Sequence, residues 1–357
     1  MNNIAIFGYG TVGSGLFDYL RKDKDTNIVS VFGRENKRSL LKELLTTNPQ
    51  TILDDDSIDT VFECLGHDTL SYDIIKGALK KGKAVITSNK ETVAKHLAEY
   101  LSLANENSTS IQFEAAVGGE IPLIAPLILQ SSFEPIYEIQ GILNGTTNYI
   151  LTKMNKDGLS FQDALKLAQG KGFAEQDPSA DILGTDLKRK SIILANILTR
   201  SDIDEEKINV FPMNGITKEI LSENRKKGCE IKYLADIHHE KNSVSILISL
   251  ALLKDSSLSH IEYEKNAVLF RTHKAGDILI SSSGAGKYPT ANSMMQDYIR
   301  RKNNAVIPFT LNGKSEMKET ISGKFICYQK EKKTILEDPE REALKHYDLV
   351  IQDRTGE

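Results

Sequence analysis

The feature that most constrains the fold is a glycine-rich turn near the N-terminus. A short apolar run, Asn3–Phe7, leads directly into Gly8-Tyr9-Gly10-Thr11-Val12-Gly13, and apolar residues then recur at helical spacing as far as Leu20. This order of strand, glycine turn and helix is the context in which G-x-G-x-x-G binds a dinucleotide. The alternative is a strand-to-helix turn that binds no ligand.

The residues of this turn have separate parts to play. Gly8 permits the tight turn, Gly10 lets the backbone approach a pyrophosphate, and Gly13 lets the helix pack closely on the strand. The phosphates would rest on the free N–H groups at the start of the helix, where Thr11 and Val12 stand. These five residues are the first candidates for cofactor binding.

Strands and helices alternate along the first third of the chain. Apolar runs at 28–32, 59–65, 83–87 and 111–114 are typical of strands, and residues 71–80 have the spacing of an amphipathic helix. Such alternation gives right-handed crossovers and a mostly parallel sheet. The sequence therefore predicts an α/β protein with a Rossmann-type doubly wound sheet.

The second predicted strand ends in Gly33-Arg34, where a fold selective for NAD usually places an acidic residue. Arg34, with Lys37 or Arg38, is suited to the 2′-phosphate of NADP, although Glu35 beside them opposes an anion. NADP is therefore favoured over NAD as the cofactor. A solvated charged loop is the alternative interpretation.

Two further loops follow strand ends, where open α/β sheets place their ligands. Lys90, in the run Ser88–Glu91, is a candidate functional cation, with an ordinary surface lysine as the alternative. Glu114 precedes Gly118-Gly119, a turn whose carbonyl oxygens could project together. These oxygens could hold a hard monovalent cation, and an ordinary structural loop fits the sequence equally well.

After Pro122 the pattern becomes α+β, with strands expected at 137–143, 245–253, 267–270 and 277–282. Between the first two of these strands, Gly141–Leu198 mixes turn-prone and charged residues more densely than a plain core tolerates. Gly145 and Thr146 offer backbone and hydroxyl groups, and the segment also contains Glu175, Asp181, Asp186 and Lys190. We interpret this segment as the binding site of a small charged substrate.

A helix is predicted over residues 182–198 of this segment. Lys190, Ile193, Leu194 and Ile197 lie at i, i+3, i+4 and i+7, so they share one apolar face. Asp186 is four residues before Lys190 and can meet it on the helix surface. Lys190 either extends its ammonium group to water or is partly buried with a lowered pKa, which would suit proton transfer.

Composition sets broader limits. At 357 residues the chain is long enough for two domains, and its formal charge of −4 argues against a general nucleic-acid or anionic-membrane binder. The longest apolar runs are too short to span a bilayer. The three cysteines stand far apart and no signal peptide is recognisable, so we expect a cytoplasmic protein that acts on a small molecule.

Taken together, these stretches resemble the homoserine dehydrogenase family. The matching segments, in the family's order, are IFGYGTVGSG at 6–15, SNKE at 88–91, EAAVGGEIP at 114–122, GILNGTTNYILTKM at 141–154, GFAEQDPSADILGTDLKRK at 172–190 and SGAGKYPTA at 283–291. They span roughly residues 1–300, and the block at 141–190 is the most specific.

The resemblance implies reversible, NAD(P)-dependent interconversion of L-homoserine and L-aspartate 4-semialdehyde. Lys190 would donate a proton to the aldehyde oxygen, and Lys90 would be a second active-site lysine near the nicotinamide end of the cofactor. Glu175 and Asp186 would bind the ammonium and hydroxyl region of the substrate, with Asp181 as a nearby acidic position.

The resemblance also implies a sodium site and an assembly. The sodium ligands would be the Glu114 side chain and the carbonyls of Val117, Gly119 and Ile121, and Gly286 would contact the cofactor. The assembly would be a homodimer whose subunits meet through the second domain's sheet. The expected domains are a dinucleotide-binding domain at 1–125, completed by about 284–310, a substrate and dimerisation domain at 126–283, and an extension of unknown role at 311–357.

The sequence departs from the family at Glu120 and at Lys188, where smaller residues are usual. Residues 302–357 do not look like the family's usual end and are too short for the regulatory ACT domain of some members. A dehydrogenase for another short amino-aldehyde and a cofactor-binding sensor without turnover are the alternatives. The retained lysines and carboxylates argue against the sensor, which has no need of a proton donor.

Overall fold

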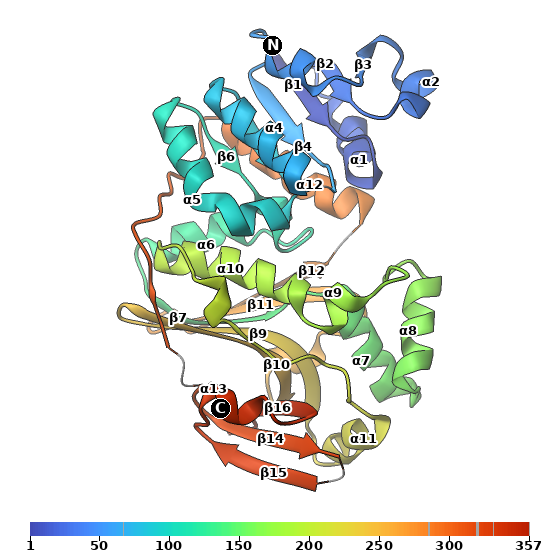
Figure 1. Ribbon diagram of the computed structural model, residues 1–357, viewed down its shortest axis with the longest axis vertical. Helices are drawn as coiled ribbons and strands as arrows, with labels where there is room; N and C mark the ends of the chain where they lie inside the picture. Colours follow the sequence, from blue (N-terminus) through green and yellow to red (C-terminus); the bar gives the residue numbers. More distant parts are fainter. Residues whose placement is uncertain (67, 285, 319–320, 331, 357) are drawn as a thin grey trace. The chain divides into compact units, whose positions relative to one another are not determined.

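The protein is described by a computed structural model at residues 1–66, 68–284, 286–318, 321–330 and 332–356. The chain divides into two compact units (Figure 1). Unit 1 comprises residues 1–128 and 285–312, and unit 2 comprises residues 129–284 and 313–357. Ala285, which belongs to the family-like segment at 283–291, lies outside the described residues.

Unit 1 is built on a six-stranded sheet of order β3-β2-β1-β4-β5-β6. Its described strand pairs are all parallel, which confirms the predicted doubly wound sheet. The strands are β1 (Asn2–Phe7), β2 (Thr26–Phe32), β3 (Leu45–Thr46), β4 (Thr60–Glu63), β5 (Ala84–Thr87) and β6 (Ile111–Gln112). The order reverses between β1 and β4, and ligands bind at such a switch point, outside the carboxyl ends of the strands.

Helices cover both faces of this sheet (Figure 1). On one face, α1 (Thr11–Leu20) and α12 (Lys287–Lys302) bury Leu16 and Tyr298 against Ile4 and Ile6. Right-handed crossovers place α4 (Asp68–Lys80) and α5 (Lys90–Glu106) on the other face. The remaining helical segments are η1 (Glu35–Lys37), α2 (Arg38–Leu41), η2 (Lys42–Leu44), α3 (Pro49–Leu53), η3 (Glu114–Ala116) and α6 (Ile124–Ser131).

Unit 2 contains a ten-stranded mixed sheet whose main path is β12-β11-β7-β9-β10-β16-β14-β15. The strands are β7 (Ile136–Ile142), β8 (Asn209–Val210), β9 (Glu230–Glu240), β10 (Ser243–Leu253), β11 (Lys265–Thr272), β12 (Asp277–Ser283), β13 (Glu316–Met317), β14 (Lys324–Gln329), β15 (Lys332–Glu337) and β16 (Leu349–Arg354). The helices are α7 (Gly145–Asp157), α8 (Phe161–Gly170), α9 (Ser179–Ile182), α10 (Thr185–Thr199), η4 (Glu205–Lys207), α11 (Lys218–Lys226), η5 (Ser257–His260) and α13 (Arg341–Leu344). This arrangement confirms the α+β architecture predicted for the part of the chain after Pro122.

The predicted helix at 182–198 is wrong at its start. The helix is interrupted there, because α9 ends at Ile182 and α10 begins only at Thr185. Gly184 between them has φ of +81°, and a Cβ atom there would lie 2.3 Å from the Tyr233 hydroxyl oxygen. A left-handed residue packed this closely interrupts the helix, and only glycine fits the space.

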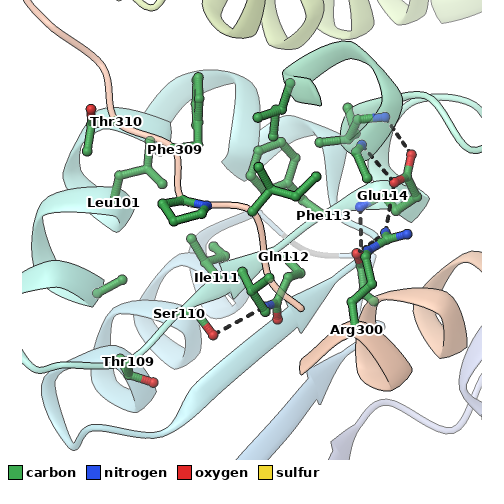
Figure 2. Close-up of a pocket in the computed structure, with 18 of the residues that line it drawn as sticks. Leu101, Thr109, Ser110, Ile111, Gln112, Phe113, Glu114, Arg300, Phe309 and Thr310 are labelled. Atoms are coloured by element: carbon green, nitrogen blue, oxygen red, sulfur yellow. Dashed lines mark hydrogen bonds and ion pairs between the residues drawn. The ribbon is translucent and has the colours of Figure 1, made fainter. Parts of the chain in front are cut away.

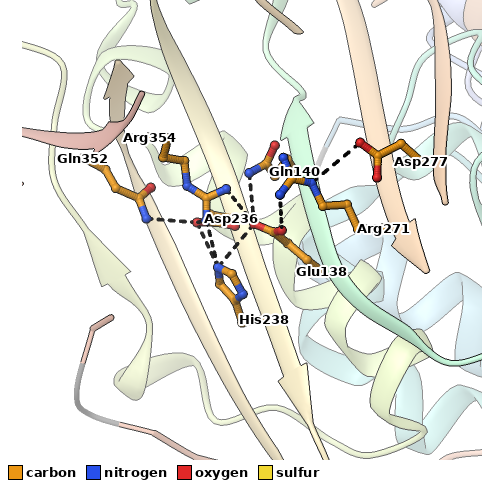
Figure 3. Close-up of polar contacts among 8 residues, drawn as sticks. All are labelled: Glu138, Gln140, Asp236, His238, Arg271, Asp277, Gln352 and Arg354. Carbon is orange, nitrogen blue, oxygen red and sulfur yellow. Dashed lines mark hydrogen bonds and ion pairs between the residues drawn. The ribbon is translucent and has the colours of Figure 1, made fainter. Parts of the chain in front are cut away.

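The C-terminal strands belong to the sheet of unit 2. β16 pairs in parallel with β10, and Arg354 near its end is 3% exposed on its side chain. The Arg354 guanidinium lies 2.6 Å from the Glu138 carboxylate and 2.8 Å from that of Asp236 (Figure 3). Glu138, Asp236 and His238 are close enough together to hold a metal ion, but this guanidinium already supplies the positive charge between the two carboxylates.

No helix in the described part of the chain is both long and apolar enough to cross a membrane.

Candidate active site

The polar centre of unit 2 is organised around Lys190 on α10. Its ammonium donates to the backbone carbonyl of Leu143 at 2.6 Å and lies 2.9 Å from the Asp186 carboxylate. Lys190 as a whole is 9% exposed, and Asp186 is 4% exposed. Helical phase predicted that the two would meet, and the structure has Lys190 partly buried, as one of the two alternatives proposed. Its ammonium is anchored inside the unit and does not extend to water.

Asn144 connects the two acidic residues of this centre. Its side-chain amide donates to Asp181 at 2.6 Å and to Asp186 at 2.9 Å, while its carbonyl oxygen accepts from the amide of Thr147. Asn144 therefore caps α7 and aligns both carboxylates. Asn144 is not among the residues predicted from the sequence, although an asparagine directly before a helix is a recognisable N-cap signal.

Gly145 and Thr146 form the first turn of α7, next to Asn144. The Thr146 hydroxyl donates to the carbonyl of Phe173 at 2.6 Å, which ties α7 to the loop after α8. At Gly145 a Cβ atom would lie 2.7 Å from the carbonyl oxygen of Glu264, so the close approach of that backbone requires glycine. Both predicted residues thus lie at the centre, in a supporting position.

The charge of this polar centre is unevenly compensated. Burial raises the pKa of Asp181, and the neighbouring charge of Asp186 adds to the increase, while the hydrogen bond from Asn144 and the charge of Lys190 oppose it. Two carboxylates beside one lysine leave the centre with an excess of negative charge when all three are ionised. Such a site attracts an ammonium group.

Glu175 is not part of this hydrogen-bonded group. It lies exposed in the loop between α8 and α9, where its backbone carbonyl accepts from the Gln169 side chain. The structure therefore brings together Gly145, Thr146, Asp181, Asp186 and Lys190 and leaves the Glu175 side chain facing solvent.

In unit 1 the glycine turn has the geometry of a dinucleotide site. Gly8 has φ of +105°, and a Cβ atom on Gly13 would lie 1.9 Å from the Gly8 carbonyl oxygen, so both positions require glycine. A Cβ atom on Gly10 would meet nothing within 4 Å, so that position borders open space. Gly10 is the N-cap of α1 and has no side chain to accept from the first helical N–H groups, including those of Thr11 and Val12. The residues present fit a pyrophosphate.

Gly286 lies at the start of α12, where it is the N-cap residue with φ of +135°. The backbone of the next residue, Lys287, packs closely against Gly15 of α1. A Cβ atom added to Gly15 would lie only 2.8 Å from the Lys287 carbonyl oxygen. Gly286 is therefore held close to the helix that follows the glycine turn.

Arg34 follows β2 and is exposed. Glu35, the neighbouring acidic residue that would repel an anion there, is paired with Arg38. The Arg38 guanidinium donates two hydrogen bonds of 2.8 and 2.9 Å to its carboxylate. This pairing neutralises Glu35, and it also removes Arg38 from the candidates for the 2′-phosphate. Arg34 and Lys37 remain the candidates for the 2′-phosphate.

Lys90 is the first residue of α5, beyond the carboxyl end of β5. Asn89 before it caps the helix by accepting from the amides of Glu91 and Thr92. The amide of Asn89 in turn donates to the Thr87 hydroxyl, which donates to the Glu63 carboxylate at 2.5 Å. This chain of hydrogen bonds fixes the start of α5.

Glu63 anchors that chain from inside the sheet of unit 1. It is fully buried and also accepts from the Ser71 hydroxyl and the Leu65 amide, both at 2.7 Å. Burial raises the pKa of Glu63, and these hydrogen bonds oppose the increase. Glu63 is not among the residues predicted from the sequence, because a lone acidic residue in an apolar strand does not indicate which groups it will contact.

Two of the four predicted sodium ligands, Glu114 and Gly119, already have hydrogen-bond partners. Glu114 is fully buried, and its carboxylate accepts from the amides of Leu123, Ile124 and Ala125 at 2.5 to 3.1 Å. Arg300 lies 2.9 Å from the same carboxylate (Figure 2). The Gly119 carbonyl accepts from the Ser293 hydroxyl. The donors at Glu114 thus already compensate its negative charge.

Comparison with known proteins agrees with both parts of this arrangement. Residues 8–114 match the family model for the NAD-binding domain of homoserine dehydrogenase, and residues 122–299 match the model for homoserine dehydrogenase itself. The homoserine dehydrogenase of Bacillus subtilis is 34% identical over 323 residues, which span 87% of this chain and 75% of the relative.

Solved structures show the same likeness. A homoserine dehydrogenase from Thiobacillus denitrificans matches with a TM-score of 0.87 and 25% identity, over 99% of this chain and 98% of the other. A hyperthermophilic archaeal homoserine dehydrogenase in complex with NADPH matches with a TM-score of 0.73 and 27% identity, over 87% and 99% of the two chains. With the sequence relatives, these matches show that the chain belongs to the homoserine dehydrogenase family of NAD(P)-dependent oxidoreductases.

Proposed function

We propose that the chain interconverts L-homoserine and L-aspartate 4-semialdehyde, with Lys190 as the proton donor and acceptor. The observation that carries this assignment is the buried Lys190 ammonium, held between the Asp186 carboxylate and the Leu143 carbonyl. A lysine fixed in this way presents an N–H donor in a defined direction without the cost of ordering a mobile side chain.

The nicotinamide, when bound, supplies or accepts the hydride. Reduction of the aldehyde places negative charge on its oxygen, and Lys190 stabilises that charge and transfers a proton from Nζ to the oxygen. In the oxidative direction the homoserine hydroxyl returns its proton to the lysine. Asp186, 2.9 Å from Nζ, orients the ammonium in both directions.

Asp181 and Asp186 also provide the negative charge that selects an amino-aldehyde. The excess of carboxylates over lysine at this centre favours the substrate's ammonium group. Glu175 contributes to this recognition only if its loop brings the side chain inward when the substrate binds. The loop is tied to α7 by a hydrogen bond from Thr146, next to Asn144, so such a movement would be coupled to the start of α7.

The residues that would hold the cofactor are the glycine turn, Gly286 and Lys90. Gly8, Gly10 and Gly13 shape the backbone, and the amides at the start of α1 would bind the pyrophosphate. We propose a preference for NADP, because Arg34 is exposed beyond β2 while Glu35 is neutralised by Arg38. A cytoplasmic location remains a prediction from the cysteine content.

Substitution of Lys190 tests the catalytic assignment. Lys190→Met keeps most of the side-chain length and removes the proton donor, so we expect kcat to fall by about 100- to 10,000-fold. Binding of NADPH, followed by its fluorescence, is expected to survive. The matched control is Lys188→Met on the same helix, whose ammonium is 3.9 Å from Glu205 and remote from the polar centre. Near-normal turnover of Lys190→Met would refute the assignment.

We further propose a homodimer that forms through the sheet of unit 2. β12 is an edge strand of that sheet, and Leu279 on it is 40% exposed beside a cavity of about 510 Å³. The backbone N–H and C=O groups at such an edge can pair with those of a second copy of the chain, and β15, the strand at the opposite edge, is the alternative surface.

Sedimentation velocity tests this assembly. The wild-type chain of 39.7 kDa is expected at twice that mass, and Leu279→Asp at the monomer mass. The control is Ile335→Asp on β15, the opposite edge strand, where the exposed fraction is 53% and no change is expected. A monomeric wild type, or dissociation caused by the control alone, would contradict the proposed surface.

A further inference from the structure

We propose that Arg300 supplies permanently the positive charge that a sodium ion would bring to Glu114, so that this chain needs no bound monovalent cation. The inference goes beyond the proposed function, because it concerns the charge balance of unit 1 and not the reaction. It rests on the hydrogen bonds and burial of three side chains, Glu114, Asp297 and Arg300.

Glu114 requires compensation wherever the charge comes from. The residue is fully buried, and an isolated carboxylate is strongly disfavoured in such surroundings. Three backbone amides at the start of α6 donate to it, and these carry only partial positive charge. Arg300 adds a full positive charge at 2.9 Å from Oε2, which it shares with a second buried carboxylate, Asp297.

Arg300 is held in place from a second side. Its guanidinium donates to Asp297 Oδ1 at 2.7 Å, and Asp297 Oδ2 accepts from the backbone amide of Glu114 at 2.9 Å. The three residues thus form a closed ring of contacts between α12 and η3 (Figure 2). An arginine fixed by two carboxylates loses less freedom for each bond it makes than a flexible lysine would.

The Glu114 carboxylate has no acceptor position left for an additional cation. Its Oε1 accepts from the amides of Leu123 and Ile124, and its Oε2 accepts from the Ala125 amide and from Arg300. A sodium ion at this carboxylate would have to displace one of these four donors. One of the other assigned ligands, the Gly119 carbonyl, is already hydrogen-bonded to Ser293. The position of Arg300 in the last turn of α12 is also favourable, since the C-terminal end of a helix attracts positive charge.

Thermal unfolding in different salts tests this inference without any measurement of activity. The chain is first freed of sodium by dialysis, and its unfolding midpoint is then measured in NaCl, KCl and choline chloride at equal ionic strength. The wild type is expected to unfold at the same temperature in all three salts. A midpoint that is specifically higher in NaCl, or saturable broadening of the ²³Na resonance by the wild type, would overturn the proposal.

Variants of Arg300 test the same inference from the other side, by removing the arginine's charge and asking whether sodium then replaces it. Arg300→Gln leaves Glu114 without a full positive charge, so we expect its midpoint in choline chloride to fall by roughly 5–10 °C. Because the space near the carboxylate is then uncharged, NaCl is expected to restore part of this loss and choline chloride none. An Arg300→Gln variant that does not distinguish the two salts would overturn the proposal.

Two further variants keep the test decisive if Arg300→Gln does not fold. Arg300→Lys retains the charge and is expected to remain insensitive to sodium; a sodium-specific shift in this variant would count against the proposal. Arg301→Gln is the matched control, because Arg301 is the next residue on α12 and pairs with Asp59, away from Glu114. It is expected to respond to the three salts as the wild type does, and a sodium response in this control would assign the effect to the end of α12 and not to Arg300.

Discussion

At the scale of single residues, cofactor choice depends on one exposed side chain. Arg34 stands beyond β2, and its neighbour Glu35 is paired with Arg38. We expect Arg34→Ala to raise KM for NADP by about tenfold, the loss of one charge-assisted contact, and to leave KM for NAD almost unchanged. Initial rates with each cofactor measure this. An equal effect on both would show that Arg34 does not contact the 2′-phosphate.

The sequence predicted part of the catalytic centre, and the reason for the limit is physical. Asp186 and Lys190 are four residues apart on one helix, and local periodicity is enough to place them together. Asn144 and the Leu143 carbonyl come from a different element, and only the packing of α10 beside the end of β7 brings them to Lys190. A pattern that is local in sequence carries no information about such contacts.

At the scale of secondary-structure elements, the start of α5 is set by buried hydrogen bonds. The Thr87 hydroxyl joins Glu63 to the amide of Asn89, and Asn89 caps the helix that begins with Lys90. Thr87→Val keeps the shape and removes the hydroxyl, which leaves the Asn89 amide and the Glu63 carboxylate each one partner short. We expect a loss of about 1–3 kcal/mol in unfolding free energy.

The same substitution is expected to lower kcat more than it changes KM for homoserine, because it disturbs the position of Lys90. Steady-state kinetics and urea unfolding measure the two effects. Ser102→Ala, an exposed substitution farther along α5, serves as the control and is expected to alter neither. Unchanged kcat in Thr87→Val would mean that the hydrogen bonds only stabilise the fold.

Element boundaries show where sequence patterns mislead. The apolar spacing of α10 extends back through Ile182, and nothing in that spacing marks the break at Gly184. The interruption comes from Tyr233 on β9, a residue remote in sequence whose hydroxyl occupies the space a side chain would need. Similarly, β6 ends at Gln112, because Glu114 turns into η3 to reach the amides of α6.

At the scale of the whole molecule, the C-terminal segment is part of a sheet. β14 and β16 extend the sheet of unit 2, and Arg354 joins β16 to Glu138 on β7 and Asp236 on β9. Sequence patterns cannot reveal this, because the ion pairs link residues more than one hundred positions apart. Short strands among charged turns were all that could be recognised there.

Removal of this buried arginine tests its structural role. Arg354→Met leaves two buried carboxylates with less compensation, and we expect the unfolding free energy to fall by about 3–5 kcal/mol. Lys324→Met is the control, since it removes a half-exposed partner of Asp353 on the neighbouring strand and is expected to cost about 1 kcal/mol or less. Equal small losses from both variants in urea unfolding would contradict a structural role for Arg354.

The chain is proposed to be an enzyme that oxidises homoserine. The most direct measurement is the absorbance of reduced nicotinamide when purified protein is mixed with L-homoserine and NADP or NAD. We predict that the absorbance rises with L-homoserine, faster with NADP, and that it does not rise with L-serine, which lacks one methylene group. No increase with L-homoserine and either cofactor would contradict the claim.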